Sequence, residues 1–497
     1  MSTVTTERVE APLVLALDIG TSSVRSVLFD RLGRAVEGVE AHQALELRTT
    51  ADGAAEVDPD VVLELVRRCL DGVLVQAGPL GSKIAGVATS TFVSNILGVD
   101  EPGQAITPLT TYADTRAEAE VAWLKAELDE AGIHDRTGCQ FHSSYLPARL
   151  RWLARTQPDL FRKVSRWISI GEYLELKLFG DTAVSYSVAS WTGLLDRHRL
   201  VWDEPLLKVL PVRPGQLSPL TDVNVPHRGF LPASASRWRA LQDVPWFPAV
   251  GDGAAANIGS GCVSPGRVAL TVGTSSAMRA IVPSPVVHIP AGLWCYRVDS
   301  RRSLPGGALS EGGNVFAWIN STLKLGDLTK VDSALAGLAP EAHGLTVLPF
   351  FAGERSPGWA GHARATIHGL SLATTPLEIL RAGLEAVAYR ITMVFELLRQ
   401  LLPPEPKVVA SGRALLSSPT WLQIMADVLG RPVATAGIQE ASARGAALLA
   451  LEALGALAGL EEAPDFISTT YQPDARRHAV YRAAMERQRE LYDKLVQ

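Results

Sequence analysis

Cysteine is scarce in this chain of 497 residues. The four that are present, Cys69, Cys139, Cys262 and Cys295, lie far apart and form no Cys-x-x-Cys pair. Neither a zinc site nor a disulfide framework is therefore indicated. Widely spaced, unpaired cysteines are typical of a reducing compartment, so we expect buried, reduced thiols and a cytoplasmic location.

Long apolar runs and blocks of like charge are also missing. The first 20 residues carry acidic side chains before a short apolar run, which is unlike a secretory signal. The apolar segment 441–460 contains Arg444 and Glu452, so it predicts a buried helix and not a membrane span. The 47 basic and 52 acidic side chains are interspersed and give a net charge of −5. Neither a nucleic acid nor a membrane is expected as a partner.

A repeated tetrad is the most informative feature that is present. The chain reads LDIGTSSVR over residues 17–25 and LTVGTSSAMR over residues 270–279. Each copy of Gly-Thr-Ser-Ser lies between two apolar, β-branched stretches, which predicts a strand, a tight loop and a second strand. The chain is also longer than one hydrophobic core usually organises. We therefore predict a duplicated domain, with one copy in each half of the chain.

Each loop offers chemistry that suits a phosphate. A glycine followed by small hydroxyl residues leaves backbone N–H groups open to phosphate oxygens. A single such tetrad is more often a plain turn. Two copies facing each other across a cleft would bind a polyphosphate from both sides.

Two side chains beside the first loop are candidates with alternatives. Asp18 lies two positions before Gly20. It either helps to hold Mg²⁺, usually through water, or accepts N–H bonds within the turn. Arg25 either reaches a phosphate or lies on an exposed strand face.

A second glycine-rich stretch, FPAVGDGAAANIGSG, covers residues 247–261. An apolar strand ends at Asp252, and a helix of very small residues follows, which would let the backbone approach a ligand closely. The Asp252 carboxylate either accepts a proton from an attacking hydroxyl or caps the helix.

The rest of the pattern predicts an α/β protein. Residues 115–132 are amphipathic and predict a helix that ends at Gly132. Thr375, Pro376 and Glu378 form a capping box that begins a helix running toward Leu402. Residues 406–412 predict a strand, and residues 419–430 a helix. We expect the boundary between the halves near residues 252–265.

The ordered motifs LDIGTSSVRSVLFD, GDGAAANIGSG, TVGTSSA, LPFFAGERSPGW, IHGLSLATTPLEILRAGLEAVAYR and EASARGAALLA resemble the FGGY family of carbohydrate kinases. The resemblance covers about residues 12 to 490. It implies two ribonuclease-H-like domains of the actin-like ATPase fold with a cleft between them. Residues 12–255 would bind the sugar and carry the first phosphate loop, and residues 256–490 would bind ATP.

The resemblance also implies roles for individual residues. Asp252 matches the family's catalytic base, and Asp18 would lie at the magnesium. The ATP-binding residues would be Gly20, Thr21, Ser22, Ser23, Arg25, Gly273, Thr274, Ser275, Gly412 and Arg413. The cofactors would be ATP and Mg²⁺, the partner a small sugar or sugar acid, and the assembly a homodimer, as in many family members.

Residues 111–122, 134–152, 311–318 and 354–359 resemble the gluconokinase-like branch. Tyr112 and Tyr145 stand where relatives contact substrate, although both could be core residues. The pair Asp114 and Arg116 matches a family Asp-x-Arg and is interpreted as an ion pair. Ser94 lies where xylulokinases have Gln-Met-His, so a hydrogen bond to the sugar is absent or replaced.

Two further departures concern basic residues. Arg413 replaces a glycine of the adenine-side motif, where it would either crowd the adenosine or stack on it. Arg149 replaces a usual lysine, which keeps the charge but changes the geometry.

Three functions stay open on the sequence. The first is phosphorylation of a sugar acid such as gluconate, for which Arg25, Arg116 or an unidentified base would have to meet the substrate carboxylate. The second is a kinase for xylulose or another ketose or polyol, against which the missing Gln-Met-His counts. The third is a non-catalytic actin-like nucleotide switch, which would have no need of the stretch around Asp252.

Overall fold

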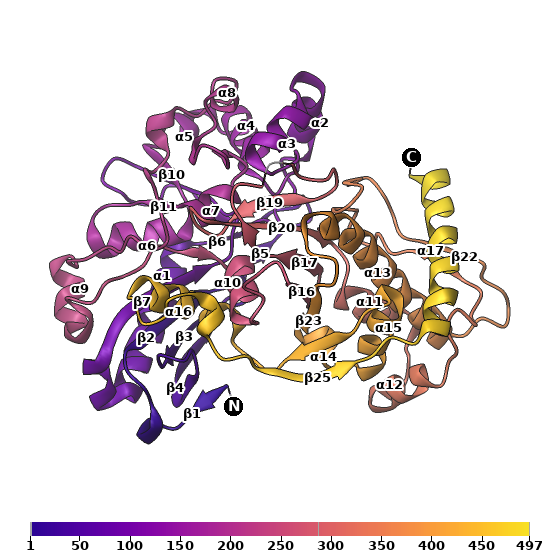
Figure 1. Cartoon of the computed structure of the whole chain (residues 1–497). Coiled ribbons are helices and arrows are strands. Elements are labelled where there is room, and N and C mark those ends of the chain that lie inside the picture. Colours follow the sequence, from indigo (N-terminus) through magenta and orange to yellow (C-terminus); the bar gives the residue numbers. More distant parts are fainter. Residues whose placement is uncertain (1, 287, 497) are drawn as a thin grey trace.

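Two β-sheets organise the computed structural model, which describes residues 2–286 and 288–496 (Figure 1). The first sheet has six strands in the order β1-β4-β3-β2-β7-β15. Their bounds are Thr3–Val4 (β1), Leu13–Ile19 (β2), Ser23–Phe29 (β3), Ala35–Ala44 (β4), Ile84–Thr91 (β7) and Val250–Gly251 (β15). All of these strands precede residue 252.

The second sheet is formed by strands that follow residue 266. Its order is β18-β20-β17-β16-β23-β24-β25, and β19 also pairs with β20. The bounds are Arg267–Val272 (β16), Ser276–Ala280 (β17), Val282–Pro283 (β18), Trp294–Arg297 (β19), Arg302–Leu309 (β20), Lys407–Ser411 (β23), Val433–Ala436 (β24) and Ile467–Tyr471 (β25).

The centres of the two sheets repeat one arrangement. Strands β2 and β3 form an antiparallel hairpin, and β7 pairs with β2 in parallel. Strands β16 and β17 form the matching hairpin, and β23 pairs with β16 in parallel. The prediction of two hairpins with the same loop is therefore confirmed, and the mixed α/β architecture agrees with the fold class expected from the sequence.

Alternation along β2 gives each face of the first sheet its own core. Leu13, Leu15, Leu17 and Ile19 pack with helix α1 (Pro59–Ala77). Val14 and Ala16 lie in the core that contains helix α16 (Ala441–Ala453). Because side chains alternate along a strand, Asp18 continues the row that faces α16.

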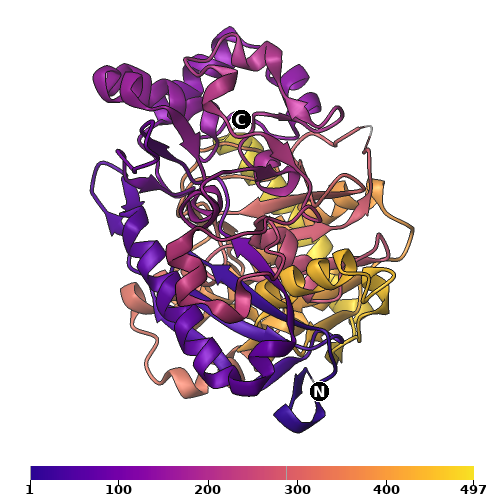
Figure 2. The ribbon, with the colours of Figure 1, turned by 90° about the vertical axis from the view of Figure 1, so that its left-hand side faces the viewer.

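Helix α16 belongs to the C-terminal half of the chain but packs on the first sheet, where it contacts β2, β7 and helix α10 (Asp252–Gly259). Figures 1 and 2 show this late, yellow segment beside the indigo strands. A Cβ on Gly259 would lie 1.8 Å from the carbonyl oxygen of Ala441, and one on Gly445 would lie 1.8 Å from that of Ala255. The small residues of these two motifs thus allow two helices to touch, a packing role that the sequence interpretation missed.

The helices on the second sheet follow their sequence signals. Helix α13 (Pro376–Leu398) begins with the predicted capping box of Thr375 and Glu378 and continues as a 3₁₀ turn to Leu401. Helix α15 (Pro419–Leu429) ends at Gly430, which is left-handed. Both share one core with helices α11 (Gly313–Leu323) and α17 (Ala475–Leu495).

One predicted helix is wrong in its extent. Residues 115–132 form parts of two helices, α2 (Glu118–Glu127) and α3 (Glu130–Thr137). Leu128 is extended, and the Asp129 side chain accepts a hydrogen bond from the Gly132 N–H. Asp129 therefore caps a new helix, and Gly132 lies inside that helix instead of ending the first one.

Strand β19 joins the second sheet to a helical segment of the first half. The Cys295 N–H donates to the Gly138 carbonyl at 3.0 Å, and the Arg297 N–H donates to the Ser190 Oγ at 2.9 Å. Ser190 ends helix α7 (Tyr186–Ser190). These bonds bring residues from both halves to one cavity.

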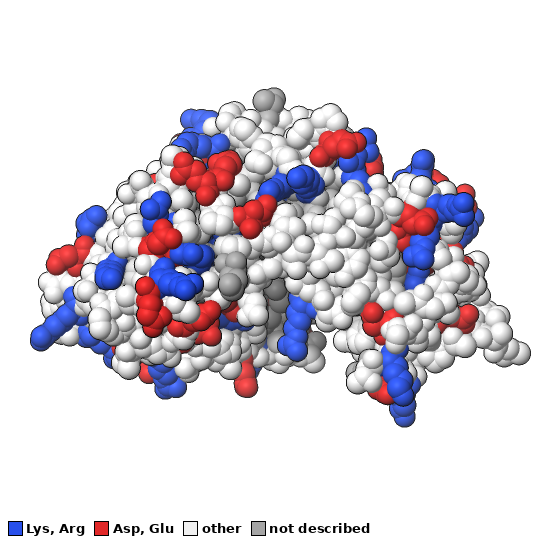
Figure 3. All heavy atoms as spheres, turned by 60° about the horizontal axis from the view of Figure 1, so that its bottom comes forward, with Lys and Arg blue, Asp and Glu red and all other residues white. Residues whose placement is uncertain are grey.

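Over the described residues, no helix is both long and apolar enough to cross a membrane. On the face drawn in Figure 3, acidic and basic side chains are interspersed.

Candidate active site

The first Gly-Thr-Ser-Ser loop joins β2 to β3 in a tight turn. The Gly20 N–H donates to the Ser23 carbonyl at 2.9 Å. Ser23 is buried, whereas Thr21 is half-buried and Ser22 is exposed. Backbone and hydroxyl groups at the tip of this loop are therefore accessible to a ligand.

The second loop also has an internal bond from its glycine, but to the first serine: the Gly273 N–H donates to the Ser275 carbonyl at 2.9 Å. The start of helix α11 supports it: the N–H groups of Gly313 and Asn314 donate to the carbonyls of Gly273 and Thr274 at 2.8 and 3.1 Å. A Cβ on Gly313 would lie 2.8 Å from the Gly273 oxygen. The glycine therefore allows α11 to approach the loop, which the sequence alone did not reveal.

Gly412 and Arg413 follow β23 and differ in their surroundings. Gly412 has a φ of 92°, and a Cβ there would lie 2.4 Å from the Val272 carbonyl oxygen. This glycine is needed for the packing of its turn against β16. Arg413, the first residue of helix α14 (Arg413–Leu416), is exposed.

A cavity of about 300 Å³ lies beside these residues in the C-terminal half. Apolar side chains form most of its lining, and polar groups are few. The lining residues are Gly313, Phe316, Val331, Asp332, Leu335, Leu384, Ala414, Ser417, Ser418 and Trp421. A mostly apolar slot next to the second loop suits a flat, partly apolar group such as a nucleobase.

Asp18 lies at the end of β2 with an unusual carboxyl group. Its Oδ1 is buried and has no hydrogen-bond partner among the described residues. Burial raises the pKa of Asp18 to about 7; the Ser90 hydroxyl lowers it, and the negative charge of Asp252 raises it further. A buried carboxylate oxygen without a donor fits a hard cation such as Mg²⁺, which prefers oxygen ligands.

Arg25 lies beside Asp18 on the neighbouring strand, where the two residues are direct partners in the β2–β3 ladder. Its Nη1 donates to the Oε2 of Glu440 at 2.6 Å, and its Nε donates to the Ser23 hydroxyl at 3.2 Å. Glu440 precedes helix α16. Arg25 is therefore held in an ion pair and is not free on an exposed strand face.

Asp252 is the first residue of α10 and follows the short strand β15. Its Oδ1 accepts a hydrogen bond from the Gly253 N–H at 2.7 Å. Burial raises the pKa of this carboxyl, and the positive charge of Arg279 acts in the opposite direction. A carboxyl group with a raised pKa at a cavity wall suits a general base, and the helix-start bond is compatible with that role.

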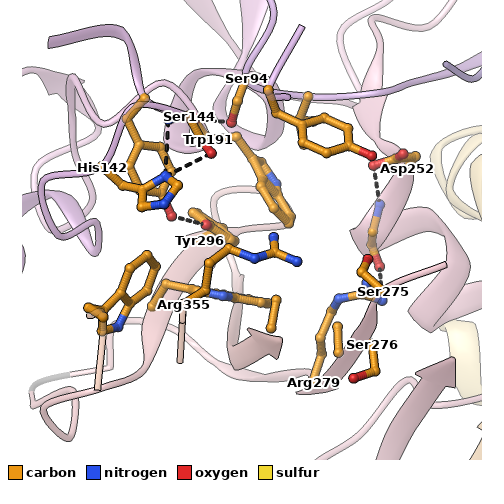
Figure 4. A pocket seen from close by; sticks show the side chains of 18 residues that line it. Ser94, His142, Ser144, Trp191, Asp252, Ser275, Ser276, Arg279, Tyr296 and Arg355 are labelled. Carbon is orange, nitrogen blue, oxygen red and sulfur yellow. Dashed lines mark hydrogen bonds between the residues drawn. The ribbon is translucent and has the colours of Figure 1, made fainter. Parts of the chain in front are cut away.

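One cavity of about 160 Å³ brings Asp252 together with the three residues predicted to contact substrate, Ser94, Tyr112 and Tyr145 (Figure 4). Tyr112 is 42% exposed, whereas Tyr145 is buried. The cavity is also lined by residues of the second sheet, including Ser275 of the second loop. Residues from both halves of the chain thus surround one small space.

Aromatic side chains form one wall of this cavity. The hydroxyl groups of Tyr145 and Tyr296 are hydrogen-bonded, and the Tyr296 ring stacks on Trp191 with centroids 3.6 Å apart and on Trp294 at 4.3 Å. The Ser94 hydroxyl donates to the Trp191 carbonyl at 2.7 Å. Ser94 thus fixes the position of Trp191, in addition to lining the cavity.

The sequence interpretation missed several lining residues, namely His142, Ser144, Trp191, Arg279, Tyr296 and Arg355. Arg355 lies inside LPFFAGERSPGW, and Arg279 ends the second repeat, LTVGTSSAMR, so the charge of both was a signal that could have been used. The others come from segments that only the tertiary fold brings to the cavity. The Asp114–Arg116 ion pair is confirmed, with 2.6 Å between Asp114 Oδ2 and Arg116 Nη2.

Comparisons with known proteins agree with this geometry. Residues 13–259 match the FGGY family of carbohydrate kinases, N-terminal domain, and residues 268–454 match the C-terminal domain of the same family. A gluconokinase of Bacillus subtilis (strain 168) is 28% identical over 474 residues, which are 92% of this chain and 91% of that protein.

Solved structures give the same result. The gluconate kinase from Lactobacillus acidophilus has a TM-score of 0.89 and 26% identity, covering 97% of this chain and 98% of that one. A ligand-bound xylulose kinase from the same species gives the same values. The chain therefore has the actin-like, ribonuclease-H-like fold of these kinases, and it belongs to the FGGY family of carbohydrate kinases.

Proposed function

We propose that this ATP-dependent carbohydrate kinase phosphorylates a hydroxyl group of a sugar acid such as gluconate, with Asp252 as the general base. The observation that carries the proposal is the charge of the cavity. Two arginines, Arg279 and Arg355, line it, and Asp252 is the one carboxylate among its described lining residues. A site with this balance favours a substrate that carries a negative charge.

The resemblance to the gluconokinase of Bacillus subtilis and to the gluconate kinase of Lactobacillus acidophilus supports the same substrate. The xylulose kinase of Lactobacillus acidophilus supports a neutral ketose as the second candidate. The absence of Gln-Met-His around Ser94 and the two cavity arginines count against that candidate.

In this proposal the two halves of the chain divide the work. Residues 12–255 supply Asp252 and most of the sugar contacts, and residues 256–490 bind ATP but also contribute Arg279 and Arg355 to the sugar cavity. Helix α16 of the second half packs on the first sheet. The nucleobase enters the cavity beside Gly412 and Trp421. The second loop, Gly273 to Ser275, binds the inner phosphates, while Gly20 to Ser23 and Arg25 face the γ-phosphate.

Asp18, with its unpaired Oδ1, would help to hold Mg²⁺, which neutralises the charge of the phosphates when it is bound. Asp252 accepts the proton of the attacking hydroxyl. The raised pKa of Asp252 makes it a better proton acceptor than an exposed aspartate. The aromatic wall excludes water that would otherwise hydrolyse ATP.

The cellular setting is also part of the proposal. All four cysteines are free and buried, which supports a reducing cytoplasm. A homodimer is proposed because members of this family are often dimers.

The experiment is ADP release from MgATP with gluconate, xylulose, ribulose, glycerol, erythritol and other aldonates, using Asp252→Asn as the blank. We expect the highest kcat/KM with an aldonate, and a loss of about 10²- to 10⁴-fold in Asp252→Asn. Preference for a neutral sugar would exclude the sugar acid, and near-normal turnover by Asp252→Asn would exclude its role as base.

A further inference from the structure

The two cavity arginines serve different neighbours. Arg279 is the residue whose positive charge acts on the pKa of Asp252, and its Nη1 lies 3.5 Å from the Gly253 carbonyl. Arg355 is the charged group that acts most strongly on His142. In Figure 4, Asp252 and Arg279 lie on one side, His142 lies on the other, and the Arg355 guanidinium points into the space between them. The cavity thus has a reacting end and an end without a carboxylate.

Arg355 is held in a fixed position by the chain around it. The preceding Glu354 pairs with Arg390, and its Oε2 accepts a hydrogen bond from the Tyr492 hydroxyl at 2.7 Å. The Trp359 N–H donates to the Arg355 carbonyl at 2.6 Å. The guanidinium itself donates through Nη2 to the Leu309 carbonyl at 2.5 Å. This bond uses one of its five N–H donors, so most of the fork is left for a ligand.

Arg355 forms no ion pair with a carboxylate in the described part of the chain. Its side chain donates a hydrogen bond to the Leu309 carbonyl instead. Glu311 is the acidic group whose pKa responds to Arg355. Burial raises the pKa of Glu311 to about 8, so this carboxyl is mostly protonated at pH 7. An arginine with uncompensated charge at a cavity wall is suited to bind an anionic group.

His142 adds a neutral donor at the same end, and Ser144 fixes its tautomer. The Ser144 N–H donates to the His142 Nδ1 at 3.1 Å, so the neutral ring carries its proton on Nε2. Burial and the nearby Arg355 lower the pKa of His142 to about 3, which keeps the ring neutral. The Ser144 hydroxyl lies 2.9 Å from Nδ1 and donates to it as well, which leaves the imidazole Nε2–H of this cavity-lining residue for a ligand.

We propose that Arg355, together with His142, binds the substrate carboxylate at the end of the cavity remote from Asp252. This inference rests on the proposed function. A planar guanidinium is matched to a carboxylate, and the imidazole N–H of His142 adds a neutral donor. With the carboxylate held there, the hydroxyl that reaches Asp252 is the one at the other end of the carbon chain. Arg355 is thus a specificity-determining residue for acids over neutral polyols.

The test compares gluconate with glucitol, which has the same number of carbons but a hydroxymethyl group in place of the carboxylate. The variants are Arg355→Gln and Arg355→Lys. The matched control is Arg364→Gln, because Arg364 is an exposed arginine of the same segment that bonds only to nearby carbonyls. The readout is the ratio of kcat/KM for gluconate to kcat/KM for glucitol, with the KM for ATP measured in parallel.

We expect Arg355→Gln to lower this ratio about 100-fold, mainly through the KM for gluconate, because a charged, bidentate partner is lost. Arg355→Lys keeps the positive charge but lacks the forked guanidinium. Its ratio should therefore lie between that of the unmodified enzyme and that of Arg355→Gln. Arg364→Gln should keep the ratio of the unmodified enzyme. An unchanged ratio in Arg355→Gln would overturn the inference. A rise in the KM for ATP that exceeds the rise for gluconate would also overturn it, because Arg355 would then contact the nucleotide.

Two controls separate the possible failures. ADP binding and thermal unfolding of each variant show whether it is folded. If the unmodified enzyme prefers glucitol or a ketose, the proposed function fails. If it prefers gluconate and Arg355→Gln keeps that preference, only this inference fails.

The position of the new phosphate gives an independent readout. Phosphorus NMR of the product should show coupling to the terminal CH₂ protons, at the carbon most distant from the carboxylate. Aldonates of four and five carbons should keep measurable affinity but lose kcat, because a shorter chain held at Arg355 places its terminal hydroxyl farther from Asp252. Phosphate on a hydroxyl adjacent to the carboxylate would contradict the orientation.

Discussion

Arg25 on strand β3 and Glu440 before helix α16 form an ion pair of 2.6 Å, although they belong to opposite halves of the chain. Glu440 lies where the chain returns from the second sheet to the first, because it follows β24 and precedes α16. The negative charge of Glu440 raises the pKa of Asp18, and the positive charge of Arg25 lowers it. The pair therefore connects this crossing segment to the first phosphate loop.

Breaking this pair should affect nucleotide use more than stability. Both side chains are about a third exposed, so Arg25→Gln or Glu440→Gln should change the free energy of unfolding by less than about 1 kcal/mol. We expect Arg25→Gln to raise the KM for ATP about tenfold, since a charged phosphate contact is lost. Glu440→Gln should raise it less, because Arg25 stays but loses its orientation.

The double variant decides whether the two residues act together. If Glu440 works through Arg25, the double variant should have the same KM for ATP as Arg25→Gln alone. Additive effects would mean that Glu440 contributes separately, and unchanged kinetics in Arg25→Gln would remove Arg25 from the ATP site.

Two glycines near the second loop should respond differently to alanine. A Cβ on Gly273 meets no atom within 4 Å, so Gly273→Ala should fold normally. If phosphates approach this backbone, the variant should still bind ATP more weakly. Calorimetric titration with ATP, beside thermal unfolding, checks both statements. Normal ATP affinity would mean that the phosphates do not approach Gly273.

Gly412→Ala, by contrast, changes a glycine that is needed for packing. Its φ of 92° and the 2.4 Å approach of a Cβ to the Val272 oxygen both disfavour alanine. We expect a loss of about 2 kcal/mol or more in the free energy of unfolding. Urea unfolding measures this loss, and unchanged stability would show that the turn can relax.

The capping box of α13 gives a prediction on stability alone. The Thr375 side chain accepts a hydrogen bond from the Glu378 N–H, and the Glu378 carboxylate accepts one from the Thr375 N–H. Thr375→Ala should lower the free energy of unfolding by about 1 kcal/mol and leave kcat and KM unchanged. A change in kinetics without a change in stability would contradict a purely structural role.

Local signals predicted much of the fold. The hairpins around Gly20 and Gly273 and the start of the helix at Thr375 depend on neighbouring residues, and they are as expected. The extent of the helix after residue 115 was wrong because apolar spacing continues through Asp129, although this residue caps a new helix. The spacing of apolar residues does not reveal where one helix ends and a side-chain cap begins another.

The site was predictable only in part. Asp252 directly follows β15, and Asp18 is the last residue but one of β2, so their positions could be inferred from strand ends. The contact of α16 with the first sheet, and hence the pairing of Arg25 with Glu440, depends on packing between distant segments. His142 and Arg355 reach one cavity for the same reason, and no local pattern marks such a meeting.

The pH dependence of kcat/KM for the sugar should report on Asp252. A general base must be deprotonated, so activity falls as the pH falls through its pKa. Burial raises that pKa, which places the acid limb above the range of an exposed aspartate. The positive charge of Arg279 lowers the pKa, so Arg279→Gln should move the acid limb to higher pH.

The prediction concerns the acid limb, because the charge of Arg279 also interacts with Tyr296 and Arg355. Arg364→Gln, which lies outside the cavity, is the control and should keep both limbs. A shift of the acid limb to lower pH, or none, would mean that Arg279 does not act on the titrating group. Since the direction of the shift depends only on the sign of the removed charge, a general loss of activity cannot produce it.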